Sequence, residues 1–217
     1  MPDIALALKS LVIYFVPLLL GITCHEVAHG WVAYRLGDPT AKAEGRLTLN
    51  PVRHFDPAGA AIFFLTTLFG PFVIGWAKPV PIVPAYFKKP QLGMALVSVA
   101  GPAANILLAV GFSLLLRLLA VPLHGEPGPF AVYVLYPLFL ICNAGVNVNI
   151  ILAVFNLIPV PPLDGSKILA WLLPNALAEK YLSLERYGFL LLLLLLATGL
   201  VGRIIMPLYR LARDLLL

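Results

Sequence analysis

The chain has 217 residues, of which 61% are hydrophobic and only 12% are charged. Soluble globular domains carry about 25% charged residues, so the composition excludes an ordinary soluble protein and indicates a lipid bilayer as the solvent. The net charge of +5 comes from Lys and Arg residues that are scattered among the connecting segments. Charges that flank membrane spans have this distribution, and no basic patch is formed, so we expect no nucleic-acid partner.

Five segments are apolar enough to suggest membrane-spanning helices, which need about 20 predominantly apolar residues. They cover residues 4–34, 58–76, 92–120, 130–158 and 187–209. We therefore predict an α-helical, multi-pass integral membrane protein with about five to six transmembrane helices. A single domain is expected over residues 1–217. Residues 4–166 would form its functional core, and residues 166–217 would add an amphipathic stretch and the last span. Lys and Arg are shared too evenly among the loops to predict the orientation in the membrane.

The first apolar segment contains His25, Glu26 and His29 in the pattern His-Glu-x-x-His. Residues four apart lie on one face of a helix, so the two imidazoles could bind one metal ion. The carboxylate beside them could accept a proton from water. Three ionisable side chains so close together in a membrane span are costly unless they form a site. Cys24 could also bind metal, but it projects about 100° away from His25 on a helix, which favours a packing role.

A third ligand is needed, because a catalytic zinc site uses three protein ligands and keeps one position open. The acidic candidates are Asp38, Glu44, Asp56 and Asp164. Asp164 is favoured because prolines break the preceding apolar segment, and irregular backbone at membrane depth typically marks a site. The same segment carries amides that are expected to face a polar interior or to bind backbone, at Asn143, Asn147, Asn149 and Asn156.

Residues 39–53 alternate between polar and apolar side chains around Gly45. This pattern predicts a short β-hairpin that re-enters the protein beside the metal site, although a surface turn also fits it. Residues 77–84 contain three prolines, which exclude a helix and predict an extended loop.

Other polar and small residues have less specific patterns. His54 follows the predicted hairpin and lies either near the site or in an ordinary loop. His124, which shares a Pro- and Gly-rich loop with Glu126, is expected to face solvent. Small residues around Gly101 should let another helix approach closely, with Asn105 one turn later.

Five motifs within residues 25–165 stand out together. They are His25-Glu26-Val27-Ala28-His29, Gly45-Arg46-Leu47-Thr48-Leu49-Asn50-Pro51, Gly75-Trp76-Ala77-Lys78-Pro79-Val80-Pro81, Ala100-Gly101-Pro102-Ala103-Ala104-Asn105, and Asn156-Leu157-Ile158-Pro159-Val160-Pro161-Pro162-Leu163-Asp164-Gly165. In combination they resemble the site-2 protease family, the M50-type intramembrane zinc metalloproteases.

This resemblance implies one zinc ion per chain, with His25, His29 and Asp164 as ligands and Glu26 as the catalytic base. It also implies that Asn156 lies near the active site and that the hairpin is the re-entrant β-hairpin of the family. The chain is expected to be a short form without a PDZ or CBS domain, located in a prokaryotic cell membrane.

By the same resemblance, the protein would hydrolyse peptide bonds within or next to transmembrane segments of membrane-protein substrates. Zinc lowers the pKa of bound water to about 7, and Glu26 would pass the released proton to the leaving amine. A helical substrate must unwind before it is cut. An edge strand could then pair with the unwound segment, which makes substrate-binding candidates of Arg46, Leu47, Thr48 and Leu49.

Two other functions use the same residues. A membrane metal transporter or sensor would use the histidine pair and the intramembrane asparagines as a path for the metal. A catalytically inactive membrane scaffold would keep only the fold. The sequence leaves open the substrate, the water path, the gating and the oligomeric state.

Overall fold

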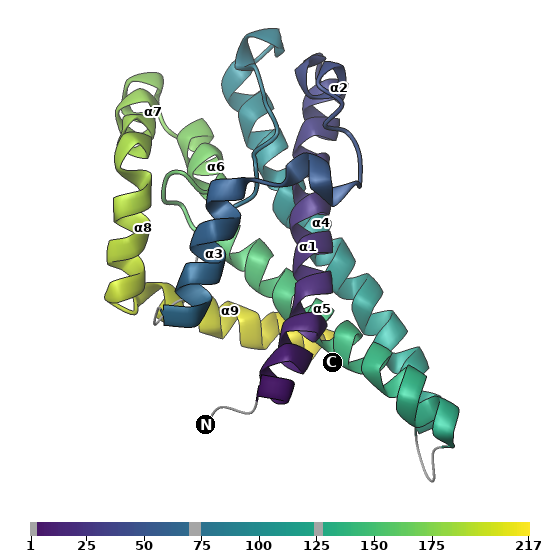
Figure 1. Ribbon diagram of the computed structural model, residues 1–217. Helices are drawn as coiled ribbons and strands as arrows, with labels where there is room; N and C mark the ends of the chain where they lie inside the picture. Colours follow the sequence, from purple (N-terminus) through teal and green to yellow (C-terminus); the bar gives the residue numbers. More distant parts are fainter. Residues whose placement is uncertain (1–3, 70–74, 124–127) are drawn as a thin grey trace.

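The computed structural model describes residues 4–69, 75–123 and 128–217. Within these ranges the chain forms helices and connecting segments and contains no β-strand (Figure 1). The α-helices are α1 (Ile4–Arg35), α2 (Thr40–Ala43), α3 (Pro57–Phe69), α4 (Pro90–Ala120), α5 (Tyr136–Asn156), α6 (Asp164–Leu172), α7 (Asn175–Leu182), α8 (Gly188–Ala197) and α9 (Leu200–Leu216). Shorter helical turns are η1 (Pro51–His54), η2 (Pro84–Tyr86), η3 (Val121–Leu123), η4 (Ala131–Leu135) and η5 (Ser183–Tyr187). The predictions for His124 and Glu126 lie outside the described residues.

Helices α1, α4 and α5 pack against one another and form the centre of the molecule (Figure 1). Helix α6 packs against α4, and α9 lies across α5. A buried apolar cluster joins α4, α5 and α9, and its central residues include Ala109, Val146, Ile150, Val201 and Ile205. The three central helices therefore form a fixed frame for any side chains that they point inward.

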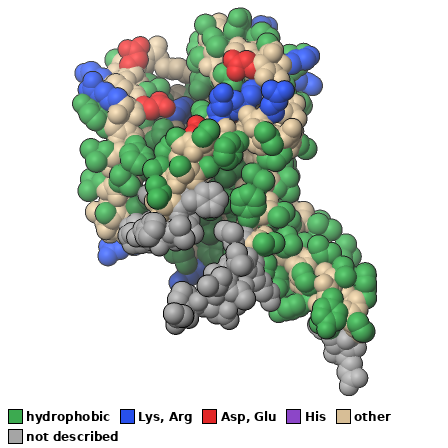
Figure 2. Space-filling view, viewed as in Figure 1, with side chains coloured by type: hydrophobic (Ala, Val, Ile, Leu, Met, Phe, Trp, Pro, Cys, Tyr) green, Lys and Arg blue, Asp and Glu red, His purple; other side chains and the backbone are tan. Residues whose placement is uncertain are grey.

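Three helical stretches are long and apolar enough to cross a membrane, namely Val12–Arg35, Pro90–Leu123 and Ala131–Asn156. Large apolar side chains project outward from them, and Leu107 and Leu118 are 72% and 69% exposed. Figure 2 shows charged side chains gathered mainly toward the end with α2 and α7, and apolar side chains over most of the rest of this face. Lipid chains provide apolar surroundings for such a surface, whereas a water-soluble monomer rarely exposes an apolar surface of this extent.

The prediction of five to six transmembrane helices is wrong. By length and composition, the described residues provide three such helices, or four if one bent pair counts as a single span. Helix α3 has only 13 residues, which is about 20 Å and too short for a hydrocarbon core of about 30 Å. The last predicted span turns at Gly199, where φ is 69°, and the helical stretches on either side are bent by 76°. Residues 70–74 of the predicted span 58–76 lie outside the described residues.

The predicted re-entrant β-hairpin over residues 39–53 is also wrong. The carboxylate of Asp38 accepts hydrogen bonds from the backbone N–H and hydroxyl of Thr40, at 2.9 and 2.5 Å, and the chain continues into α2. The side chain of Asn50 accepts a bond from Val52 N at 3.1 Å, at the start of η1. Such local side-chain bonds compete with strand pairing, and a short polar–apolar alternation does not reveal which of them prevails.

An extended segment over residues 77–83 crosses the end of α1, in agreement with the prolines of this region. Lys78 N donates to the carbonyl of His54 at 2.9 Å, and Val83 N donates to Asp38 Oδ2 at 2.7 Å. Asp38 is fully buried and thus connects α1, α2 and the extended segment. Burial alone would raise the pKa of this carboxyl, but the hydrogen bonds from Thr40 and Val83 outweigh it and hold the pKa below its ordinary value of 3.8.

Asp38→Asn should lower the free energy of unfolding by about 2 kcal/mol at pH 7, because hydrogen bonds to a charged acceptor contribute about 1.5–3 kcal/mol each. The pKa is lower in the folded state, so this stabilisation is complete above the unfolded value near 3.8. It is lost as the pH falls through the folded value. Thermal unfolding in detergent should therefore show a difference at pH 7 that narrows below pH 4. Equal stability of the variant and the wild type at pH 7 would contradict the role of Asp38.

Candidate metal centre

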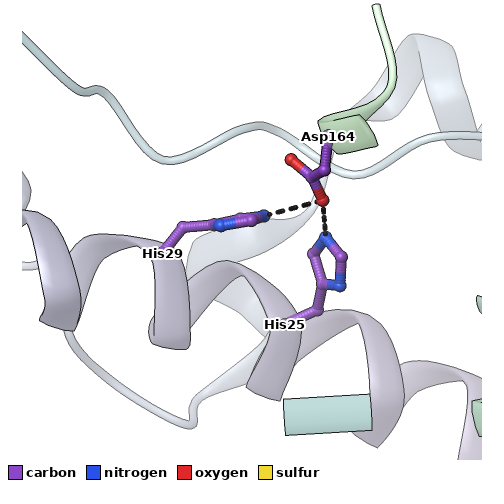
Figure 3. A group of neighbouring side chains, drawn as sticks. All are labelled: His25, His29 and Asp164. Carbon is purple, nitrogen blue, oxygen red and sulfur yellow. Dashed lines mark ion pairs between the residues drawn. The ribbon is translucent and has the colours of Figure 1, made fainter. Parts of the chain in front are cut away.

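Three side chains from two elements meet at one point between the central helices. His25 and His29 come from α1, and Asp164 is the first residue of α6 (Figure 3). The Asp164 Oδ2 atom lies 3.2 Å from His25 Nε2 and 3.3 Å from His29 Nε2. The two imidazole rings are perpendicular, with centroids 4.5 Å apart, and both Nε2 atoms point toward the carboxylate. In the described part of the chain, no other group of three His, Cys, Asp or Glu side chains is arranged to hold a metal ion.

The protonation of His29 follows from its hydrogen bond to the backbone. Its Nδ1 atom lies 2.7 Å from the carbonyl oxygen of Val97 in α4. A carbonyl oxygen can only accept, so Nδ1 carries the proton and donates it. In a neutral imidazole the other nitrogen, Nε2, then has a free lone pair, which points at Asp164.

The position of the proton on His25 follows from a chain of hydrogen-bonded amides. Its Nδ1 atom lies 2.7 Å from Asn105 Oδ1. The Asn105 amide donates to the carbonyl of Gly21 at 3.0 Å and to Asn149 Oδ1 at 2.9 Å, and Asn149 in turn donates to the carbonyl of Gly145 at 2.9 Å. The two backbone carbonyls fix the orientation of both amides, so Asn105 presents an acceptor to His25. His25 therefore also keeps its lone pair on Nε2.

Three lone-pair atoms thus converge, and a positive charge is required between them. Asp164 Oδ2 is buried and has no satisfactory hydrogen-bond partner. Protons on the imidazoles are one source of that charge. Burial alone would raise the pKa of Asp164, but its hydrogen-bonding contacts with His25 and His29 lower it to about 2. The other source is a metal cation.

The three residues fit a zinc ion. Two imidazole nitrogens and one carboxylate oxygen are a ligand set typical of catalytic zinc, with a fourth position open. Zinc–ligand distances of about 2.0–2.1 Å in a tetrahedron place neighbouring ligand atoms about 3.3 Å apart. The contacts of Asp164 with His25 and His29, at 3.2 and 3.3 Å, agree with that spacing.

Two glycines allow this approach. A Cβ atom on Gly101 of α4 would lie 2.5 Å from the Cε1 atoms of both His25 and His29, so the imidazole rings occupy the space that a side chain would need. A Cβ atom on Gly165 would lie 2.2 Å from the carbonyl oxygen of Leu157. The start of α6 can therefore lie directly against the end of α5, which sets the position of Asp164.

The carboxylate of Glu26 lies beside the two candidate histidine ligands on α1 and is held by the extended segment. Its Oε2 atom accepts a hydrogen bond of 2.8 Å from Val80 N. Its other oxygen has no hydrogen bond within the described residues. One carboxylate oxygen is thus oriented by the backbone, and the other is free to accept a proton.

The structure distinguishes among the four acidic residues that were candidates for the third ligand. Asp38 bonds to Thr40 and Val83, Glu44 is exposed, and Asp56 accepts a bond from the N–H of Gly59 at the start of α3. Asp164 alone of the four meets the histidine pair.

The residues predicted to contact substrate lie in varied surroundings. The amide of Asn156 donates to the Leu152 carbonyl of its own helix. Arg46 is buried, Leu47 packs against Gly30 of α1, and Leu49 is exposed. The predicted pairing with a substrate strand has lost its basis, because residues 46–50 form no strand.

His54 is buried, and its Nε2 atom donates to the carbonyl of Thr48 at 2.9 Å. Sequence reasoning did not predict the acceptors at Val97 and Asn105 or the link between Asn105 and Asn149. Buried amides on two different apolar segments were the only signal that could have suggested such a link.

Comparison with known proteins identifies the family to which this chain belongs. The sequence profile of peptidase family M50 matches residues 128–196. A Bacillus subtilis protein named "Putative zinc metalloprotease YwhC" is 39% identical over 96% of this chain and 91% of its own length. The chain belongs to peptidase family M50. This M50 peptidase is also 30% identical to "Putative zinc metalloprotease Rip2" of Mycolicibacterium smegmatis, over 85% of the chain and 66% of that protein. No solved structure gives a significant match.

Membership of this family identifies a metalloprotease of the site-2 protease group, as its motifs indicate. The names of the relatives support zinc as the metal, and the long apolar helices indicate a membrane protein.

Gly101→Ala should remove bound zinc from this M50 peptidase, because the new methyl group would displace both imidazoles. We expect the zinc content of the purified protein, measured by mass spectrometry, to fall at least about tenfold. Displacing the imidazoles themselves should weaken the site more than removing a hydrogen-bond partner of a ligand, which costs about 10- to 100-fold in affinity. Gly111→Ala on the same helix is the control, because a Cβ atom there meets nothing within 4 Å. Equal zinc content in the two variants would contradict the packing of the rings on Gly101.

Asn105→Ala should weaken zinc binding by about 10- to 100-fold, the usual cost of losing the partner of a ligating histidine. Competition with a chelator of known affinity measures this change. Asn143→Ala is the matched control, because its side chain forms no hydrogen bond within the described residues. Unchanged affinity of Asn105→Ala would show that this amide does not fix His25.

Proposed function

We propose that this M50 peptidase is an intramembrane zinc metalloendopeptidase that binds one zinc ion per chain through His25, His29 and Asp164. The observation that carries the proposal is the convergence of three lone-pair atoms at a buried point. A zinc ion at this point would satisfy all three atoms while both imidazoles stay neutral.

The position of the site along the helices supports action within the bilayer. His25 and His29 lie inside the candidate span Val12–Arg35. Their partners Asn105 and Asn149 lie inside the spans Pro90–Leu123 and Ala131–Asn156. A multi-pass arrangement of these helices would put the site at membrane depth, and its substrates would then be transmembrane segments or the residues next to them.

The residues around the metal provide the parts for peptide hydrolysis. When bound, zinc polarises the scissile carbonyl and lowers the pKa of water to about 7. Glu26 accepts the proton of the attacking water on its free oxygen, while Val80 N–H holds the other oxygen in place. Glu26 then donates that proton to the nitrogen of the leaving amine. Substrate contact by Asn156 and by residues 46–49 stays a prediction.

Glu26→Gln should abolish hydrolysis and leave zinc binding intact, because the amide fills the same space but cannot accept the proton. The assay uses purified protein in detergent with unfolded casein, and single-span helices fused to a reporter serve as membrane substrates. We expect a fall in turnover of at least about 100-fold, at the lower end of what general base catalysis provides. Zinc content should equal that of the wild type. Full hydrolysis by Glu26→Gln would exclude Glu26 as the catalytic base. Zinc binding without hydrolysis by the wild type would favour a metal transporter or sensor.

A further inference from the structure

Arg46 is a buried cation without a carboxylate partner. Its side chain is only 4% exposed, and no acidic side chain forms an ion pair with it in the described part of the chain. Its Nη2 atom donates to the carbonyl oxygens of Lys78 and Pro79, at 2.6 and 3.3 Å, and its Nε atom is buried without a partner. A buried guanidinium is costly unless a negative charge compensates it.

That charge lies on the other side of a single peptide group. The carbonyl of Pro79 and the N–H of Val80 belong to the same peptide unit. Arg46 binds its oxygen, and the Glu26 carboxylate accepts its N–H at 2.8 Å. A peptide unit has a dipole of about 3.5 D, and here its negative end meets the cation while its positive end meets the anion. The opposite charges of Arg46 and Glu26 therefore lie at the two ends of one oriented peptide.

The packing around this peptide holds it in place. A Cβ atom on Gly30 of α1 would lie 2.8 Å from Leu47 Cδ2 and 2.9 Å from Val80 Cγ1. The residues that follow Arg46 and the extended segment thus meet on α1 one turn after Glu26. Prolines on both sides of Val80 restrict the backbone further. The peptide between Arg46 and Glu26 has little freedom to reorient while Arg46 holds its carbonyl.

We propose that Arg46 is a positioning residue for the catalytic base, which acts on Glu26 through the Pro79–Val80 peptide. This inference rests on the protease function proposed above. The guanidinium polarises the carbonyl, which strengthens the N–H donor on the same peptide because adjacent hydrogen bonds reinforce one another. That donor fixes Glu26 Oε2, so the free oxygen faces the attacking water in each catalytic cycle. This positioning role is an alternative to the substrate contact predicted for Arg46, and the two roles are distinguished by their effects on kcat and KM.

Arg46→Gln should lower kcat by about 10- to 100-fold, since a displacement of a catalytic group by about 1 Å has effects of that size. KM for casein and the zinc content should stay within about twofold of the wild type. The reason is that losing an interaction made only in the transition state lowers kcat without changing substrate binding in the ground state. Arg46→Lys keeps the charge but loses the fork geometry, so it should recover part of the lost kcat. Arg53→Gln is the matched control, because Arg53 is exposed and the variant loses the same charge nearby.

Hydrogen–deuterium exchange of a peptide covering residues 77–83 gives a second readout that does not depend on activity. The Val80 amide should exchange faster in Arg46→Gln than in the wild type or Arg53→Gln, while exchange in α1 stays the same. Faster exchange throughout α1 would indicate loss of the fold and overturn a specific positioning role.

The outcomes separate this inference from the proposed function. A rise in KM at unchanged kcat would mean that Arg46 binds substrate, and unchanged kcat with unchanged exchange would mean that it positions nothing. Either result overturns the inference while wild-type cleavage still stands. If the wild type itself shows no cleavage that depends on Glu26, the protease proposal fails, and the catalytic role of Arg46 fails with it.

Discussion

The hydrogen bonds to the Nδ1 atoms of His25 and His29 are the constraint on which the centre of this protein depends. The Nδ1 protons of the two histidines are donated to acceptors on α4, the side-chain oxygen of Asn105 and the backbone carbonyl of Val97. The Nε2 lone pairs are therefore left free, and both Nε2 atoms face Asp164. Since α4 supplies both acceptors, it must lie directly against the histidine face of α1. The absence of a side chain at Gly101 makes that contact possible.

Most buried polar groups in a protein need hydrogen-bond partners within the protein itself. Here the amides of Asn105 and Asn149 are fully buried and bonded in sequence across α1, α4 and α5. The network ends on the backbone carbonyls of Gly21 and Gly145. Outside this frame, the extended segment 77–83 holds the carboxylate of Glu26, the proposed catalytic base, through the backbone N–H of Val80. The proposed metal ligands and the proposed base are thus positioned by different parts of the chain.

The sequence was sufficient for the features that depend on local spacing. The histidine pair, the long helices α1, α4 and α5, and the break before Asp164 all follow from residues close together in the chain. The hairpin and the number of spans were wrong because each depends on competition between nearly equal alternatives. The Asp38 and Asn50 side chains favour turns over strand pairing, and Gly199 redirects an apolar run that would otherwise be long enough to span. The contact of Asn105 with Asn149 could not be predicted, since it depends on how two helices pack.

X-ray absorption at the zinc edge of the purified protein tests the central claim most directly. The ligand set of His25, His29 and Asp164 predicts only nitrogen and oxygen neighbours, at about 2.0–2.2 Å, with outer scattering from two imidazoles. Cys24 lies next to the ligands in the sequence and would add a sulfur neighbour at about 2.3 Å if it bound the metal. A sulfur neighbour, scattering from fewer than two imidazoles, or the lack of zinc in protein purified without chelator would contradict the account.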